Sequence, residues 1–263
     1  MRVLGVVVAV LAVVPAWGAG LPSCAGPVEA HDVVVARVEK NGDLVLADGR
    51  AVRLEGLLLP AGRRDRAPAY LAEEALSVLG ERAAGRSVTL SVFVPKEDRY
   101  GRIRAQILAG EPGEWLQNTM LRRGLARVSI APERRECAAE LYAAEDAARK
   151  ARAGIWKTGF YDVRAPDALA GTVGTFQIVE GNVISARIRN GRAYLDFGSD
   201  WRSDFKVTIA PDDLRRFRDA GVDPRTYEGL RLRVRGFVDQ LGGPEIEAAS
   251  PEAIEVIQAP PHF

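Results

Sequence analysis

The chain has 263 residues, of which 47% are hydrophobic and 27% are charged. This balance excludes a disordered chain and is that of a globular protein with room for two ordinary domains. Its 36 basic and 35 acidic residues nearly cancel, so no overall charge draws it to nucleic acid, and any anion-binding face must be a local patch.

Residues 1–20 are typical of a secretory signal peptide. Met1 and Arg2 precede an apolar run from Val3 to Trp17, and small residues follow up to Gly20. The run is shorter than the roughly 20 residues that a membrane-spanning helix needs. We therefore expect cleavage and export to the periplasm or the medium, without a membrane span.

Cys24 and Cys137 are the only cysteines, and we predict that they form a structural disulfide, because an even pair in an exported protein is most often oxidised. The bond would join the mature N-terminus to a later helix. An alternative is a lipoprotein signal from Leu21 to Cys24, with lipid on Cys24. Pro22 and the gap after the apolar run disfavour it.

A first β-rich domain is expected over residues 31–157. Its alternating or apolar runs predict five strands, and turns at Asn41-Gly42 and Asp48-Gly49 connect the first three into a meander. Helical spacing ended by glycine predicts three helices. The expected strands are Val33–Val38, Leu44–Leu46, Ala51–Leu54, Val88–Val94 and Ile103–Leu108, and the expected helices are Pro68–Ala84, Trp115–Arg123 and Glu136–Ala153.

Residues 158–174 are broken by Pro166, Gly171 and Gly174 and predict a linker to a second domain over residues 175–257. Five strands with a helix between the third and fourth are expected there, which is the OB-fold order. The fold class is therefore β-rich α+β, with two tandem OB-fold-like five-stranded barrels, the first carrying three helices. The expected strands are Phe176–Arg189, Arg192–Phe197, Phe205–Ile209, Leu230–Gln240 and Pro244–Ala248, and the expected helix is Pro211–Ala220.

Three segments of the first domain carry a family resemblance. They are the strand and Pro-containing turn Val52–Pro60, the loop Asp98-Arg99-Tyr100-Gly101-Arg102, and the helix ends Leu121–Ala126 and Ala153–Trp156. Residues 31–157 thereby resemble the thermonuclease family, also called staphylococcal-nuclease-like. In that family two aspartates and a backbone carbonyl hold calcium, a glutamate acts as general base, and two arginines bind phosphate.

The resemblance implies a site at which only some of the family's functional residues are present. Arg53 and Arg102 match the phosphate-binding arginines, whose planar forks suit phosphate oxygens. Leu58 stands at the position of one metal aspartate, and Ala61 at that of the general base. The other metal aspartate matches Gly42, with Asp43 one position away, and a slip of one residue in a strand would turn that side chain to the opposite face.

These changes predict no metal, no cofactor and no useful nuclease turnover, because neither Leu58 nor Ala61 can ligate calcium or accept a proton. An alternative is an active, calcium-dependent phosphodiesterase with displaced carboxylates, and its sign would be two or more acids beside Arg53 and Arg102. The nearby acids are Asp43, Glu55, Asp65 and Asp98. If they do not form such a site, their carboxylates belong to solvated loops or ion pairs.

Arg53 and Arg102 either bind phosphate or brace the barrel through ion pairs. Arg63, Arg64 and Arg66 follow in a loop that borders the same region and form a candidate basic patch.

The second domain resembles OB-fold nucleic-acid-binding modules in Val179-Glu180-Gly181, Tyr194–Gly198 and Val234-Arg235-Gly236. Trp201, in a polar loop, is its candidate stacking aromatic.

The leading hypothesis is an exported, catalytically degenerate protein that binds nucleic acid or another phosphorylated polymer. The second is the active phosphodiesterase with displaced carboxylates. The third is an envelope adaptor that recognises protein, which predicts an exposed apolar groove and no basic patch.

Overall fold

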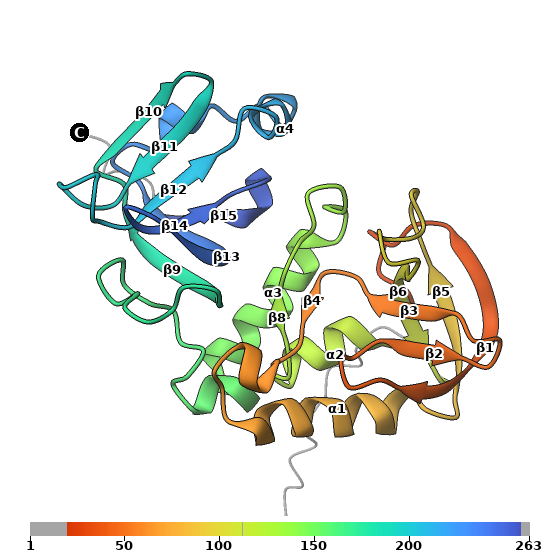
Figure 1. Cartoon of the computed structure of the whole chain (residues 1–263). Coiled ribbons are helices and arrows are strands. Elements are labelled where there is room, and N and C mark those ends of the chain that lie inside the picture. The colour runs from red at the N-terminus through yellow and green to blue at the C-terminus, as the bar shows by residue number, and fades with distance from the viewer. Residues whose placement is uncertain (1–19, 112, 259–263) are drawn as a thin grey trace, which may run out of the picture.

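The computed structural model describes residues 20–111 and 113–258, and the chain folds into two β-barrels joined by a packed segment (Figure 1). The predicted signal peptide lies outside the described residues, apart from Gly20. Within the described ranges no helix is long and apolar enough to span a membrane.

The first barrel closes from five strands that match the five predicted ones. Neighbouring strands pair antiparallel, except that the third and the fifth, β3 and β6, run parallel and close the barrel. The strands are β1 (Val28–Val38), β2 (Leu44–Leu46), β3 (Ala51–Leu54), β5 (Ser87–Ser91) and β6 (Ile103–Ala109). Three two-residue strands were not predicted, because such short pairings have no sequence period: β4 (Leu57–Leu58), β7 (Glu114–Trp115) and β8 (Arg127–Val128).

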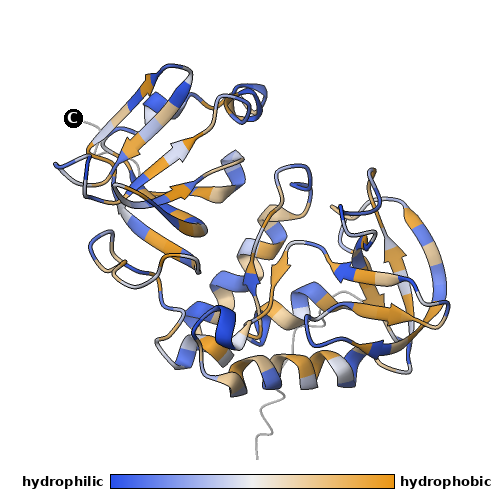
Figure 2. Ribbon diagram, in the orientation of Figure 1, coloured by the Kyte–Doolittle hydropathy of each residue, from blue (hydrophilic) through white to orange (hydrophobic). Residues whose placement is uncertain are grey.

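The three predicted helices are present, and each contributes apolar side chains to the core of the first domain. Figure 2 shows hydrophobic and hydrophilic residues following one another along these helices. They are α1 (Ala69–Ala83), α2 (Leu116–Arg122) and α3 (Ala138–Lys150). Helix α1 buries Leu71, Ala75, Leu79 and Ala83, which recur every four residues and so share one face. Helices α2 and α3 pack together between the barrel and the second domain (Figure 1).

The second barrel repeats the strand order of the first. If β9 and β10 are counted as one interrupted strand, β12 and β14 are the barrel's third and fifth strands and again the parallel pair, and helix α4 again follows the third strand. Its elements are β9 (Phe176–Asn182), β10 (Ser185–Arg189), β11 (Arg192–Asp196), β12 (Lys206–Ile209), α4 (Leu214–Asp219), β13 (Arg231–Leu241) and β14 (Gly243–Glu247). The predicted class of two tandem OB-fold-like barrels is confirmed.

Two details of the second domain differ from the prediction. The strand expected over Phe176–Arg189 is broken into β9 and β10, because the backbone of Val183 bonds to Gly229 and Leu230 instead of continuing one ladder. A further strand, β15 (Ile254–Gln258), pairs with β13 and was not predicted. Short 3-10 helices of the described chain are η1 (Gly62–Arg64), η2 (Gly154–Lys157), η3 (Pro224–Tyr227) and η4 (Pro251–Ala253).

The segment expected to be a linker is packed between the domains. Tyr161 and Leu169 are 5% and 1% exposed. Tyr161 shares an apolar cluster with Leu71 and Trp156 of the first domain and Ile178 of the second. The two barrels are therefore joined through a common core and not by a loose tether.

The predicted disulfide between Cys24 and Cys137 is confirmed. It ties the segment before β1 to the residue that precedes α3, across a sequence separation of 113. A bonded Cys24 has no thiol to carry lipid, so the structure does not support the lipoprotein alternative.

Candidate functional site

The two candidate phosphate-binding arginines meet at one end of the first barrel. Arg53 lies on β3 and Arg102 directly precedes β6, and these two strands are parallel neighbours. Asp43, in the turn before β2, lies between them. Its carboxylate accepts from Arg53 Nε at 2.8 Å and from Arg102 Nη1 at 3.2 Å, and its side chain is 5% exposed. The structure therefore brings both arginines together around a buried aspartate.

Asp98 holds the loop that leads to Arg102. Its Oδ1 accepts from the backbone N–H groups of Tyr100 and Arg102, and its Oδ2 accepts from Arg102 Nε at 2.8 Å. Gly101 permits this tight turn at φ +73°. The ring of Tyr100 is 66% exposed, with the guanidinium groups of Arg99 and Arg102 each 4.9 Å from its centroid.

The electrostatics of this cluster are those of satisfied ion pairs. Burial alone would lower the pKa of Arg102, but the carboxylates of Asp98 and Asp43 outweigh it and raise the pKa above its ordinary value. Burial alone would raise the pKa of Asp98, but hydrogen bonds from Arg102 and Tyr100 lower it. Two arginines and two aspartates together carry no net charge.

The three positions at which the resemblance implies altered site residues are Gly42, Leu58 and Ala61. Leu58 is in β4, half-buried and paired with Arg127, and Ala61 is exposed in the following loop. Gly42 is buried, and a Cβ there would meet the side chain of Leu59 at 3.2 Å. Asp43, one residue on, is therefore the carboxylate that faces the arginines.

Two of the other nearby acids serve different arginines. Glu55 accepts from Arg104, whose buried guanidinium also bonds Glu133. Asp65 accepts from Arg127 at 2.7 Å and from the hydroxyl of Tyr161 at 2.8 Å. Neither acid contacts Arg53 or Arg102, so both brace the fold.

Two acids, Asp43 and Asp98, do converge beside Arg102, which is the sign expected for displaced carboxylates. Both, however, are engaged by guanidinium groups. Across residues 20–111 and 113–258, no group of three His, Cys, Asp or Glu side chains is placed to hold a metal ion.

The three arginines of the candidate basic patch differ in their contacts. Arg63 and Arg64 lie in η1, exposed, and have no ion-pair partner among the described residues. Arg66, in contrast, donates to the carbonyl oxygens of Gly171 and Val173 and so fastens the segment between the domains. Trp201 is 52% exposed, with Arg202 over its ring at 4.5 Å, and it lies in the second domain.

Sequence reasoning missed the buried charges between the domains. Arg127 is 1% exposed and donates to the Phe176 carbonyl oxygen at 2.8 Å. Arg235 is 4% exposed and pairs with Glu145 of α3. For Arg127 the available signal was its place in the apolar run from Leu125 to Val128, since such a charge is buried only with a partner. Arg235 lies in a strand with several other charged residues, which gave no such signal.

Comparison with known proteins identifies the family that the first domain resembles. Residues 51–158 match the family model of staphylococcal nuclease homologues. No curated protein matches the chain. The match indicates a nuclease-type or nucleic-acid-binding function for the first domain.

Proposed function

We propose that this protein, whose first domain is staphylococcal-nuclease-like, is exported and binds single-stranded nucleic acid or another phosphorylated polymer without cleaving it. The observation that carries the proposal is the pair of guanidinium groups, Arg53 and Arg102, held side by side at the barrel end by Asp43. Exposed Tyr100 lies against Arg102 and offers a face on which a base can stack.

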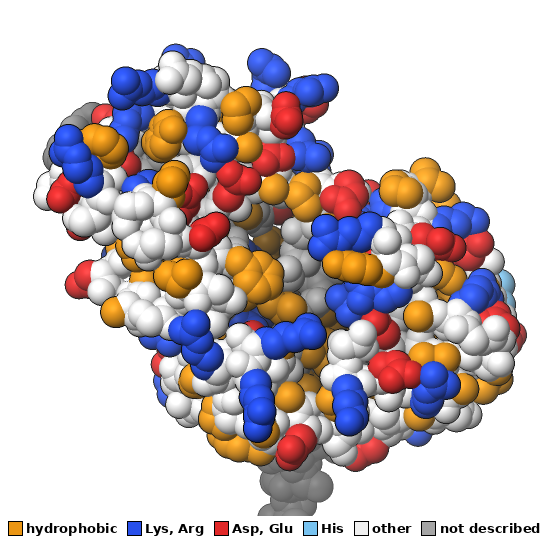
Figure 3. Space-filling model, in the orientation of Figure 1, with side chains coloured by type: hydrophobic (Ala, Val, Ile, Leu, Met, Phe, Trp, Pro, Cys, Tyr) orange, Lys and Arg blue, Asp and Glu red, His pale blue; other side chains and the backbone are white. Residues whose placement is uncertain are grey.

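Arg53 is the more accessible of the two guanidinium groups. Its side chain is 36% exposed, and among the described residues it uses only Nε, toward Asp43. Its two terminal amino groups are therefore available to phosphate oxygens. Arg99 adds positive charge beside Tyr100, and Arg63 and Arg64 are exposed in η1. Figure 3 shows blue basic side chains on the first-domain side of the hollow between the domains.

The absence of turnover follows from Leu58 and Ala61. A hydrocarbon in place of a metal-binding aspartate removes a charged calcium ligand, and a methyl group in place of the general base costs a factor of about 10² to 10⁴ in rate. Asp43 alone does not replace them, because both of its oxygens are bonded to arginine.

Export is supported by the signal-like N-terminus and by the Cys24–Cys137 disulfide, which persists only in an oxidising compartment.

The test measures retention and cleavage of labelled single-stranded DNA and RNA by the purified protein, with calcium and with chelator. We expect retention without cleavage. Arg53→Ala and Arg102→Ala should weaken retention for all sequences alike and reduce its salt slope by about 1 each. Arg50→Ala removes an equal charge from an exposed pair with Asp48 and serves as the control.

Asp43→Asn separates this proposal from the active phosphodiesterase. Removing the carboxylate frees the guanidinium of Arg53 and leaves that of Arg102 paired only with Asp98, so binding without chemistry predicts stronger retention. If the protein is instead an enzyme that uses Asp43 as a metal ligand, the wild-type protein should cleave nucleic acid in the presence of calcium, and Asp43→Asn should abolish this cleavage. Such cleavage by the wild-type protein would overturn the proposal.

A further inference from the structure

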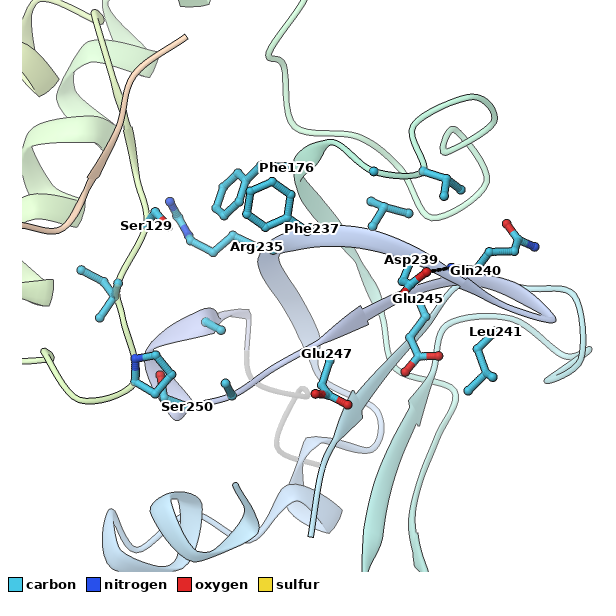
Figure 4. A pocket seen from close by; sticks show the side chains of 18 of the residues that line it. Ser129, Phe176, Arg235, Phe237, Asp239, Gln240, Leu241, Glu245, Glu247 and Ser250 are labelled. Carbon is cyan, nitrogen blue, oxygen red and sulfur yellow. Dashed lines mark hydrogen bonds between the residues drawn. The ribbon is translucent and has the colours of Figure 1, made fainter. Parts of the chain in front are cut away.

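A groove of about 800 Å³ lies between the two domains, away from Arg53 and Arg102, neither of which lines it. Its volume is within the usual range of ligand sites. The first domain contributes the loop after β8 and Tyr142, and the second contributes parts of β13 and β14 and the segment before β15 (Figure 4).

The groove exposes large apolar side chains of β13. Phe237 is 59% exposed and Leu241 is 56% exposed, whereas Val238 between them points into the core at 2%. The ring of Phe176 meets that of Phe237 edge to face, with centroids 5.4 Å apart (Figure 4). Apolar rings gathered in a concave site mark a place where a ligand is bound.

The charged side chains of the groove favour a cation. Three carboxylates line it, those of Asp239, Glu245 and Glu247, against two arginines. Both arginines already have carboxylate partners. Arg235 pairs with Glu145 and Glu255, which do not line the groove, and Arg192 pairs with Glu247, which does. Asp239 has no basic partner among the described residues. The side chains that line the groove therefore carry a net negative charge, so the groove repels phosphate and attracts Lys or Arg.

Two buried polar atoms of residues that line the groove make no hydrogen bond within the described part of the chain, the Oγ of Ser250 and the Nε of Arg235. Ser250 is 1% exposed. An unsatisfied buried hydroxyl costs free energy that a ligand recovers by bonding to it. A polypeptide backbone carries both donors and acceptors for such a hydroxyl.

We propose that this groove binds an extended segment of a partner protein that carries basic and apolar side chains. The apolar side chains pack on Phe237 and Leu241, and the basic ones reach Asp239 and compete with Arg192 for Glu247. In Figure 3 the second-domain side of the hollow carries red acidic side chains, opposite the basic side chains of the first domain. The inference adds a protein partner to the proposed function and uses a different site.

The test uses fluorescence anisotropy of labelled peptides of about ten residues, with leucine alternating with lysine in one and with glutamate in the other. We expect only the lysine peptide to bind, and Phe237→Ser to weaken it about tenfold. The double substitution Asp239→Asn, Glu247→Gln should weaken it and flatten its salt dependence. Control variants are Val256→Ser, at a side chain 51% exposed on β15, and the double Asp212→Asn, Asp219→Asn on exposed residues.

Three outcomes would overturn the inference: equal binding of both peptides, binding unchanged by the groove variants, or displacement of the peptide by oligothymidylate. The carboxylate variants keep the test decisive even if Phe237→Ser disturbs the packing of Phe176. Retention of nucleic acid should be unaffected by all groove variants, so failure here is distinguishable from failure of the proposed function.

Discussion

Arg235 of the second domain and Glu145 of the first form an ion pair from which water is almost excluded. The distance from Nη1 to Oε2 is 2.8 Å, and the side chains are 2% and 0% exposed. The other oxygen of Glu145 accepts from the backbone N–H of Val128, and the guanidinium of Arg235 lies over the ring of Tyr142 at 4.3 Å. Burial alone would lower the pKa of Arg235, but Glu145 and other nearby groups outweigh it and raise the pKa.

Glu145→Gln should destabilise the protein strongly, because it leaves a buried guanidinium without its main counter-charge. Breaking a buried pair in this way costs about 3–5 kcal/mol in the free energy of unfolding. Urea unfolding followed by tryptophan fluorescence and circular dichroism measures the loss. Glu39→Gln, in an exposed pair with Arg37, is the control and should cost less than about 1 kcal/mol. Equal losses would contradict the assigned role.

Reduction of the Cys24–Cys137 bond should lower the free energy of unfolding. A closed loop of 113 residues gives at most about 4–5 kcal/mol in the chain-entropy model. Thermal unfolding with and without reductant measures the change. The double variant Cys24→Ser, Cys137→Ser should match the reduced protein and no longer respond to reductant; a response would point to another cause.

Gly124→Ala should be far more damaging than Gly85→Ala. Both glycines have positive φ, +66° and +72°. A Cβ at Gly124 would lie 2.2 Å from the carbonyl oxygen of Ala153, whereas nothing lies within 4 Å of a Cβ at Gly85. We expect about 1 kcal/mol for Gly85→Ala, from backbone strain, and several kcal/mol for Gly124→Ala. Denaturant midpoints for the two variants check this, and similar midpoints would refute it.

Asp98 should contribute stability that depends on pH. Its pKa is lowered in the folded state from an ordinary value of 3.8, so its contribution is present above that pH and is lost as the pH falls through the folded pKa. Asp98→Asn should therefore cost about 1 kcal/mol near neutral pH, and less at about pH 3. Unfolding free energies of both proteins at the two pH values test this; a constant difference would exclude it.

The sequence predicted the elements well where one periodicity covers a whole element. The helical spacing of Leu71, Ala75 and Leu79 predicted α1, and short alternating or continuous apolar runs predicted the strands of both barrels. The break at Val183 was not predicted, although the run Glu180-Gly181-Asn182 interrupts the apolar pattern directly before it. In the structure the backbone bonds of Val183 to Gly229 and Leu230 end the ladder there. Strand β15 was missed because its pairing with β13 is not encoded locally.

The candidate site was predictable in part. The family motifs led to Arg53 and Arg102, but sequence matching left Gly42 and Asp43 undecided, because one residue reverses a side chain. The packing of Leu59 beside Gly42 leaves Asp43 as the residue that faces the arginines. The groove and the pair Arg235–Glu145 were out of reach, since these partners are 90 residues apart and charge patterns do not specify such pairings.

The buried connection between the barrels also sets a geometric limit on any partner. The ion pair between Arg235 and Glu145 is buried between the barrels, and Tyr161 lies in a core that both domains share. These contacts hold the two barrels in one relative orientation. The distance between the groove and the arginine cluster is then constant. A partner that engages both gains the high effective concentration of a bivalent ligand only if its own length matches that spacing.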